Sequence, residues 1–195
     1  MAYITRQQVR DYKSFKTNDT DNDSLLDDLI TRAQVIIDRY CNRTFEASTN
    51  TVRYFDAVRD VENNGLLLYL DDDLSEINSV TNGDGIVVAS NEYVTEPRNV
   101  TPYYAIKILS NSGKAWEYDD DPENAIAVSG KWAYSTTAPL DIQQACIELT
   151  AYLFDKRLRL VEDSRGQVSN DGVALMPSDI PRSVRSILDR YKKVL

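Results

Sequence analysis

The strongest helical pattern in the sequence lies between Pro139 and Arg159. Apolar residues recur there at steps of three and four, which is the spacing of one face of an α-helix. Pro139 and Asp141 suit a first helical turn, and Lys156 and Arg157 stand near the end, where cations complement the helix dipole. We therefore predict a helix over residues 139–159 that packs against other elements. Its apolar face comprises Ile142, Ala145, Cys146, Leu149, Tyr152 and Leu153.

Two helices are predicted before this segment. Residues 6–13 follow a small capping box, in which Thr5 and Gln8 stand three positions apart. Residues 24–40 have apolar side chains at helical spacing, and Asn42 follows them at a position where a left-handed residue commonly ends a helix. Both helices would offer an apolar face to the long helix.

A fourth helix is predicted to begin near Ile180. Pro181 suits its first helical position, and Ser178 or Asp179 could act as the N-cap. Its end is basic, because several cations follow its apolar positions. The apolar face comprises Val184, Ile187, Leu188 and Tyr191.

The hydrophobic period changes between residues 51 and 138. Residues 51–57 alternate as in a strand, residues 66–70 form a short apolar run typical of a buried strand, and residues 82–85 (NGDG) are typical of a hairpin turn. Several short strands separated by turns predict a small β-sandwich or barrel. Further strands are predicted at residues 76–81, 86–89, 93–94, 104–109 and 125–134.

The order of these elements predicts an α+β fold. We interpret it as a small helical bundle of about four helices with an inserted β-rich subdomain. The bundle would comprise residues 1–50 and 139–195, and the insertion would comprise residues 51–138. Residues 161–177 are polar and contain two glycines, which predicts a long flexible loop within the helical part.

Charge and composition narrow the possible functions. The sequence has 22 Lys and Arg against 31 Asp and Glu, a net charge of −9, so we do not expect it to bind DNA through bulk phosphate contacts. An acidic protein surface would repel the DNA backbone, and it would therefore still let DNA slide past. Neither a signal peptide nor a membrane-spanning run is visible. The absence of histidine removes His-based triads, histidine general bases and His-ligated zinc.

The remaining candidate chemistry favours structural interpretations. Cys41 and Cys146 lie in predicted helices and are expected to be buried free thiols in a reducing cytoplasm. Residues 19–23 begin like a calcium loop but lack the glycine and the final glutamate that such a loop needs. The aspartate runs 71–73 and 119–121 are interpreted as solvated turns. We therefore predict no catalytic residue, metal or cofactor.

Three junctions in the sequence resemble one protein family. Residues 38–45 (DRYCNRTF) resemble a "helix, then Y-C-x-R-x-F" junction, and residues 126–134 (IAVSGKWAY) before the long helix resemble "V-x-G-x-W-G-Y". Residues 180–191 are similar to a final "P-x-x-V-x-x-x-L-x-x-Y" helix. These motifs are those of the head–tail connector proteins of tailed phages, also called adaptor or head-completion proteins. Asn42 and Ala133 replace residues that are often glycine in the family, and asparagine tolerates the same left-handed backbone.

The resemblance implies a structural, non-enzymatic protein of the virion neck that resides in the host cytoplasm during assembly. It implies a homo-oligomeric ring of about twelve subunits under the portal, which extends the DNA channel and links the capsid to the next protein. The implied partners are other copies of the chain, the portal protein and a downstream stopper or tail protein. Genomic DNA would pass through without sequence-specific binding, and no membrane would be involved.

Two segments are predicted to form interfaces in such a particle. The loop at residues 161–177 is expected to contact a neighbouring subunit, the portal or the channel, because it is long and polar. The basic segment at residues 182–195 is expected to dock on an acidic portal surface. The candidate interface residues are Arg165, Gln167, Asn170, Asp171, Arg182, Arg185, Arg190, Lys192 and Lys193.

Two alternative functions stay open at this point. The first is a tail-completion or tail-terminator protein, and the second is a binding module built on the β-rich part. A glycan-binding module would present exposed aromatic side chains on one β face, for which Trp116, Trp132 and Tyr134 are the candidates. An enzyme is the least favoured function, and a metal or cofactor in the purified protein would revive it.

Overall fold

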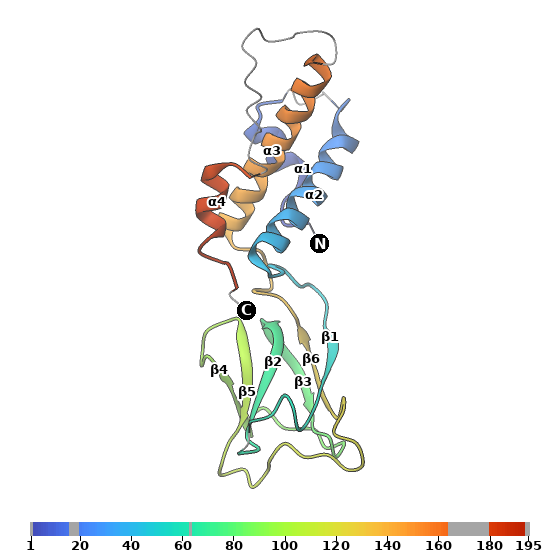
Figure 1. Ribbon diagram of the computed structural model, residues 1–195, viewed down its shortest axis with the longest axis vertical. Helices are drawn as coiled ribbons and strands as arrows, with labels where there is room; N and C mark the ends of the chain where they lie inside the picture. Colours follow the sequence, from blue (N-terminus) through green and yellow to red (C-terminus); the bar gives the residue numbers. More distant parts are fainter. Residues whose placement is uncertain (1, 16–19, 63, 164–179, 194–195) are drawn as a thin grey trace. The chain divides into compact units, whose positions relative to one another are not determined.

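The computed structural model describes residues 2–15, 20–62, 64–163 and 180–193. It confirms the predicted α+β fold, with helices and strands gathered in two compact units (Figure 1). One unit comprises residues 2–42 and 139–195, and the other comprises residues 43–138. The described helices are α1 (Arg6–Tyr12), α2 (Asp23–Cys41), α3 (Leu140–Asp163) and α4 (Arg182–Leu188). The described strands are β1 (Thr51–Phe55), β2 (Leu67–Leu74), β3 (Glu76–Thr81), β4 (Tyr93–Glu96), β5 (Tyr103–Ile108) and β6 (Ile126–Lys131).

Local signals in the sequence set the ends of α1 and α2. The predicted capping box forms, because the Thr5 side chain accepts from the Gln8 backbone and the Gln8 side chain accepts from the Thr5 backbone. Helix α2 ends at Asn42, whose φ of 52° is the predicted left-handed conformation. The helix–turn junction of the connector motif therefore has the backbone that the sequence predicted.

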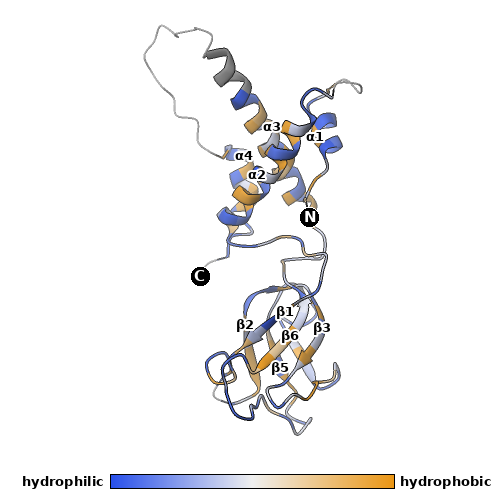
Figure 2. Cartoon of the chain, turned by 90° about the vertical axis from the view of Figure 1, so that its right-hand side faces the viewer, coloured by the Kyte–Doolittle hydropathy of each residue, from blue (hydrophilic) through white to orange (hydrophobic). Residues whose placement is uncertain are grey.

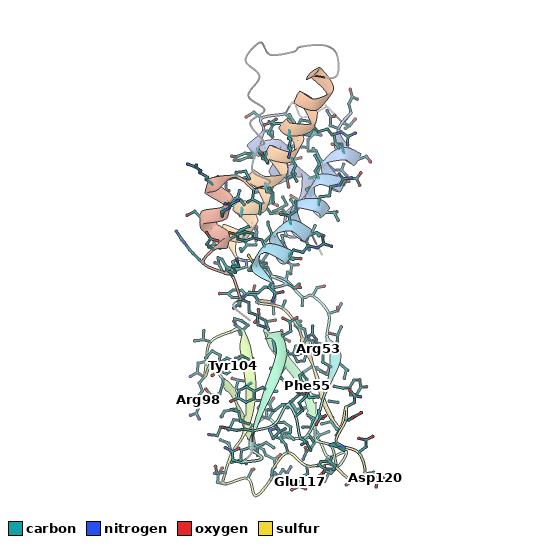
Figure 3. All side chains as sticks on the ribbon, viewed as in Figure 1. Arg53, Phe55, Arg98, Tyr104, Glu117 and Asp120 are labelled. Carbon is teal, nitrogen blue, oxygen red and sulfur yellow. The ribbon has the colours of Figure 1, made fainter. Side chains whose placement is uncertain are left out.

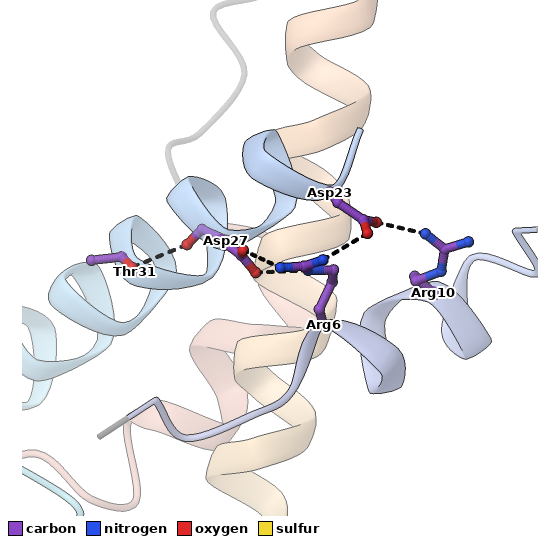
Figure 4. A network of polar contacts seen from close by, with 5 residues as sticks. All are labelled: Arg6, Arg10, Asp23, Asp27 and Thr31. Carbon is purple, nitrogen blue, oxygen red and sulfur yellow. Dashed lines mark hydrogen bonds and ion pairs between the residues drawn. The ribbon is translucent and has the colours of Figure 1, made fainter. Parts of the chain in front are cut away.

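Salt bridges join α1 to the first turn of α2 (Figure 4). Arg6 binds both Asp23 and Asp27, with 2.6 Å between its Nη1 and Asp23 Oδ2. Arg10, whose side chain is 8% exposed, places its Nη1 2.6 Å from the other Asp23 oxygen. Asp23 therefore neutralises a buried cation, which makes it a structural residue rather than a free surface charge.

The core of the helical unit lies where α3 meets the other helices. Four residues of the predicted apolar face of α3 are buried (Ile142, Ala145, Cys146 and Leu149), whereas Tyr152 and Leu153 are half-buried. Apolar and polar residues alternate along α2 and along the coloured part of α3 (Figure 2). Phe15, beyond α1, packs edge-on against Phe154 of α3, with 5.4 Å between the ring centroids. Each fully buried Leu or Ile contributes roughly 1.5–3 kcal/mol. The fully buried residues from α2, α3 and α4 include Leu26, Ile37, Ile142, Leu149 and Leu188.

Three predicted helix boundaries were wrong. Helix α3 continues to Asp163, so the first residues of the predicted loop at 161–177 are helical; the remaining loop residues lie outside the described part of the chain. Pro181 is the N-cap of α4 rather than its first residue, because its ψ of 149° is extended. Helix α4 ends at Leu188, and Tyr191 is therefore beyond the helix whose face it was predicted to complete.

The β unit consists of two three-stranded antiparallel sheets that enclose one core, as the short strands predicted. The first sheet has the order β1-β6-β3 and the second has the order β2-β5-β4. Residues 86–89 were predicted as a strand, but they form only one isolated bridge, between Thr81 and Val87. The two sheets bury a common cluster that includes Phe55, Val80, Ile126, Leu68, Ile106 and Ile108.

Gly130 of β6 marks the closest approach inside this unit. A Cβ atom at this position would lie 2.2 Å from the carbonyl oxygen of Glu76 and 2.7 Å from Leu74 Cδ1. Both distances are too short for any side chain, so only glycine fits. The glycine of the "V-x-G-x-W" motif thus has a packing reason in this chain.

Candidate functional site

The acidic and thiol side chains of the described residues form no cluster suited to a metal ion. Within residues 2–15, 20–62, 64–163 and 180–193, no three His, Cys, Asp or Glu side chains gather where they could hold a metal ion. Cys41 and Cys146 are buried free thiols, as predicted, and burial raises the pKa of Cys146 to about 12. Over the same residues, no helix has the length and apolarity needed to cross a membrane. Charged surface residues, aromatic side chains and hollows are the remaining candidate features.

The aspartate run at residues 71–73 is not a solvated turn, and that prediction was wrong. It lies in β2, where Arg53 binds both Asp71 and Asp72 at 2.9 and 3.0 Å. Asp73 is buried and pairs with Arg43 at 3.0 Å. Arg53 and the buried Phe55 both come from β1 (Figure 3). These carboxylates neutralise arginines within the β unit, so the run is structural.

The tryptophans proposed for a glycan-binding face are buried. Trp116 and Trp132 are each 5% exposed, and their indole N–H groups donate to the carbonyls of Leu66 and Thr51. Tyr134 is half-buried, with the Arg43 guanidinium 5.3 Å from its ring centroid. The three candidates therefore form no exposed aromatic platform, which overturns that route to a glycan-binding function.

Five of the nine predicted interface residues lie in or after α4. Arg182 and Arg185 are exposed one turn apart on α4, and Arg190 is exposed just beyond it. Lys192 lies over the Tyr40 ring, with its Nζ 5.2 Å from the centroid, and the backbone of Lys193 donates to Cys41. The structure thus gathers these cations in one segment. The other four, Arg165, Gln167, Asn170 and Asp171, lie outside the described residues.

Side-chain contacts hold this basic segment against the rest of the helical unit. The Tyr191 hydroxyl lies 2.7 Å from both carboxylate oxygens of Asp141, in the first turn of α3. The Tyr40 hydroxyl donates to Asp189 at 2.5 Å, which raises the pKa of Tyr40. Together with the backbone bond from Lys193 to Cys41, these contacts tie the segment to α2 and α3. The cations are therefore presented from a fixed segment.

Sequence reasoning missed an apolar groove between α2 and α3. It has a volume of about 650 Å³, and its walls are almost entirely apolar. Val35 is 42% exposed there, although it stands beside the predicted apolar stripe of α2. This additional apolar residue was the feature of the sequence that could have indicated the groove. The apolar wall comprises Leu29, Val35, Ile36 and Leu153, and the cations along the groove are Arg32, Lys156 and Arg157.

A second hollow lies where α1, α3 and the start of α4 meet. Its volume is about 540 Å³, and polar groups form a larger part of its walls. Lys13 and Asp155 form an ion pair of 2.5 Å within it, and Glu148 contributes a further carboxylate. Tyr12, the last residue of α1, is 52% exposed at its edge. This hollow and the α2–α3 groove, both formed by described residues of the helical unit, thus differ in chemical character.

Comparison with known proteins finds one family model and several solved structures that match this chain. The sequence model of the head completion protein family matches residues 2–194. Two similar solved chains come from the neck of an empty gene transfer agent particle (13% identity, TM-score 0.60) and from the virion of a native gene transfer agent particle (16% identity, TM-score 0.57). Each alignment covers 99% of this chain and 91% of the solved chain, so the whole fold is shared. A comparison with curated proteins finds no match.

The family match extends over both structural units. It includes the connector motifs at both ends of the sequence and the β unit between them, where the resemblance from the sequence alone was loose. The Asn42 turn and the close approach at Gly130 supply physical reasons for two of those motifs. The chain belongs to the head completion protein family.

Proposed function

We propose that this chain is the adaptor subunit of a virion neck, where about twelve copies form a ring under the portal. The observation that carries the proposal is the family match over residues 2–194. A head–tail connector role in a phage-like particle follows from that family. The ring, its copy number and its position under the portal are the parts that we add.

The charge and construction of the chain support this role. A net charge of −9 suits a wall that DNA must pass without binding. The family is a structural one, and the described residues hold no cluster of side chains suited to a metal ion. In this proposal the other partners are the portal protein and a downstream stopper or tail protein, and the chain assembles in the host cytoplasm.

Electron microscopy tests the proposal directly. The purified chain is mixed with portal-bearing, DNA-filled capsids encoded by the same genome. We expect additional ring-shaped density below the portal, from which the copy number can be counted. Binding to isolated tail tubes without binding to capsids would instead support the tail-completion alternative. Binding to neither would refute the adaptor role.

Within this proposal, the basic segment at residues 182–195 docks on an acidic portal surface. Arg185 and Arg190 are exposed, so reversing both charges should weaken portal binding without unfolding the helical unit. The double variant Arg185→Glu/Arg190→Glu should bind DNA-filled capsids at least tenfold more weakly. The control is Arg59→Glu/Arg98→Glu, which makes the same change in net charge at two exposed positions of the β unit. Equal binding by the two variants would refute this docking surface.

The loop predicted at residues 161–177 stays part of the proposal as a contact to a neighbouring subunit, the portal or the channel. Deletion of residues 167–172 tests it in a genome that carries no other copy of the gene. We expect fewer infectious or DNA-transferring particles than from the unaltered gene. Undiminished particle yield would remove the loop from the mechanism.

A further inference from the structure

The strongest unassigned feature of the molecule is the apolar groove between α2 and α3. Val35 and its apolar neighbours are in contact with solvent there, although buried apolar surface is favoured by roughly 25 cal/mol per Å². Cations stand along an otherwise apolar hollow, on a chain whose net charge is −9. The segment that fills this groove should therefore combine an apolar or aromatic side chain with a carboxylate.

The end of α1 has that combination. Tyr12 is 52% exposed, and Asp11 beside it is exposed as well. Asp11 accepts a hydrogen bond from Gln7 Nε2 at 2.6 Å, so its carboxylate is held on the surface of the helix. A tyrosine can bury about 150–250 Å² while keeping its hydroxyl in water, which makes it a frequent anchor at interfaces.

The groove and Tyr12 lie on different sides of α3. Leu153, Lys156 and Arg157 form the α3 wall of the groove, whereas Glu148 and Asp155 face the hollow beside Tyr12. At 3.6 residues per turn, the centres of these two stripes are roughly 140° apart around the helix axis. Tyr12 therefore cannot fill the groove of its own chain, but it can fill that of another copy.

We infer that the end of α1 in one copy docks into the α2–α3 groove of the next copy. Tyr12 enters the apolar hollow, and Asp11 lies against the cations Arg32 and Arg157. Two different faces on opposite sides of one unit make a head-to-tail contact, which is the kind of contact that closes into a ring. This inference rests on the proposed function, because it assigns the surfaces through which the ring forms.

Cysteine cross-linking tests the contact in the assembled particle. Two variants, Tyr12→Cys and Val35→Cys, are produced together in equal amounts in cells that assemble particles, and purified particles are treated with a short bismaleimide. The natural thiols Cys41 and Cys146 are buried, so they contribute little background. In an equal mixture, roughly a quarter of the subunit contacts should pair the two new thiols in the linking orientation. We expect a cross-linked dimer from the mixture and only monomer from either variant alone.

The control replaces Val35→Cys with Ser186→Cys, an exposed position on α4 away from the groove. That mixture should give no dimer. A dimer from Val35→Cys alone would mean that grooves face each other, and a cross-link to another neck protein would mean that a different partner fills the groove. Either result overturns the inference, as does the absence of dimer from particles that contain both variants.

Particles made with the unaltered chain separate failure of this inference from failure of the proposed function. Immunoblotting of these particles first establishes whether the chain is present in purified particles. Its absence would refute the adaptor role and this inference with it, whereas its presence without the Tyr12–Val35 link would refute only the contact. As a second variant, Val35→Asp places a carboxylate in the groove and should reduce incorporation at least tenfold. Ser186→Asp should incorporate normally.

Discussion

Replacing Gly130 with alanine should destabilise the β unit selectively. The added Cβ atom would meet the Glu76 carbonyl oxygen at 2.2 Å and Leu74 Cδ1 at 2.7 Å. The Leu74 side chain can change rotamer, but the carbonyl belongs to the backbone of β3, which pairs with β6 at this register. The strands must therefore separate locally, and hydrogen bonds between β3 and β6 lengthen.

The magnitude follows from the cost of placing extra atoms in a packed core. One additional methyl group in such a core costs typically 1–3 kcal/mol. A clash with backbone leaves few ways to relax, so we expect about 2–3 kcal/mol for Gly130→Ala. With a urea m-value of about 2 kcal/mol/M, the midpoint of unfolding should fall by about 1 M.

Tryptophan fluorescence can measure this change in the β unit alone. The sequence contains two tryptophans, Trp116 and Trp132, and both are buried in the core that the two sheets share. Urea titrations of the unaltered chain and Gly130→Ala are compared with Ser129→Ala, a control one residue earlier on β6. The control should shift the midpoint by less than about 0.3 M. Equal midpoints for all three chains would refute the close-packing argument.

Two further predictions concern the helical unit. Burial raises the pKa of Asp38 to about 6, so the folded state binds the carboxyl proton more tightly than the unfolded chain does. The ionised carboxylate therefore destabilises the folded state above pH 6, and this destabilisation decreases as the pH falls towards 4. Asp38→Asn can still accept the hydrogen bond from the Tyr3 hydroxyl. In thermal melts followed by circular dichroism, this variant should be about 1–2 kcal/mol more stable than the unaltered chain at pH 7.5, and nearly equal to it at pH 4.5. Equal melting temperatures at pH 7.5 would refute this prediction. Asp23→Asn should lower the melting temperature more than Asp27→Asn does, because Asp23 lies 2.6 Å from Nη1 of the buried Arg10. Asp27→Asn, at a 51% exposed carboxylate, should cost less than about 1 kcal/mol, and the reverse order would contradict the burial argument.

The helices could be predicted from the sequence because their signals are local. Apolar residues three and four positions apart define each buried face, and the capping box and Asn42 set two of the ends. The first residue of α4 was missed because proline is common both at the N-cap and at the next position. The end of α3 was missed because polarity was taken to mean a loop, although a polar stretch of sequence can also be helical.

The pairing of the strands could not be predicted, because it depends on contacts between distant residues. β1 pairs with β6, more than seventy residues later, and consecutive strands β1 and β2 belong to different sheets. The same reason explains the wrong prediction for Asp71–Asp73. Their partners Arg43 and Arg53 are distant in the sequence, and only the fold brings them close. The α2–α3 groove likewise exists only once two helices lie side by side. The proximity of the predicted interface residues from Arg182 to Lys193 could be predicted because they lie within twelve positions of the sequence.

The interrupted helical unit has a consequence for synthesis on the ribosome. Helix α2 ends at Cys41, and its main partner α3 begins at Leu140, so about a hundred residues of the β unit are translated in between. At roughly 5–20 residues per second, the apolar face of α2 waits about 5–20 s for its partner. The β unit can complete its own core during that delay, since all its strands lie within residues 43–138. The α2–α3 groove and the segment after α4, which we propose as assembly surfaces, can therefore form only after the β unit has been synthesised.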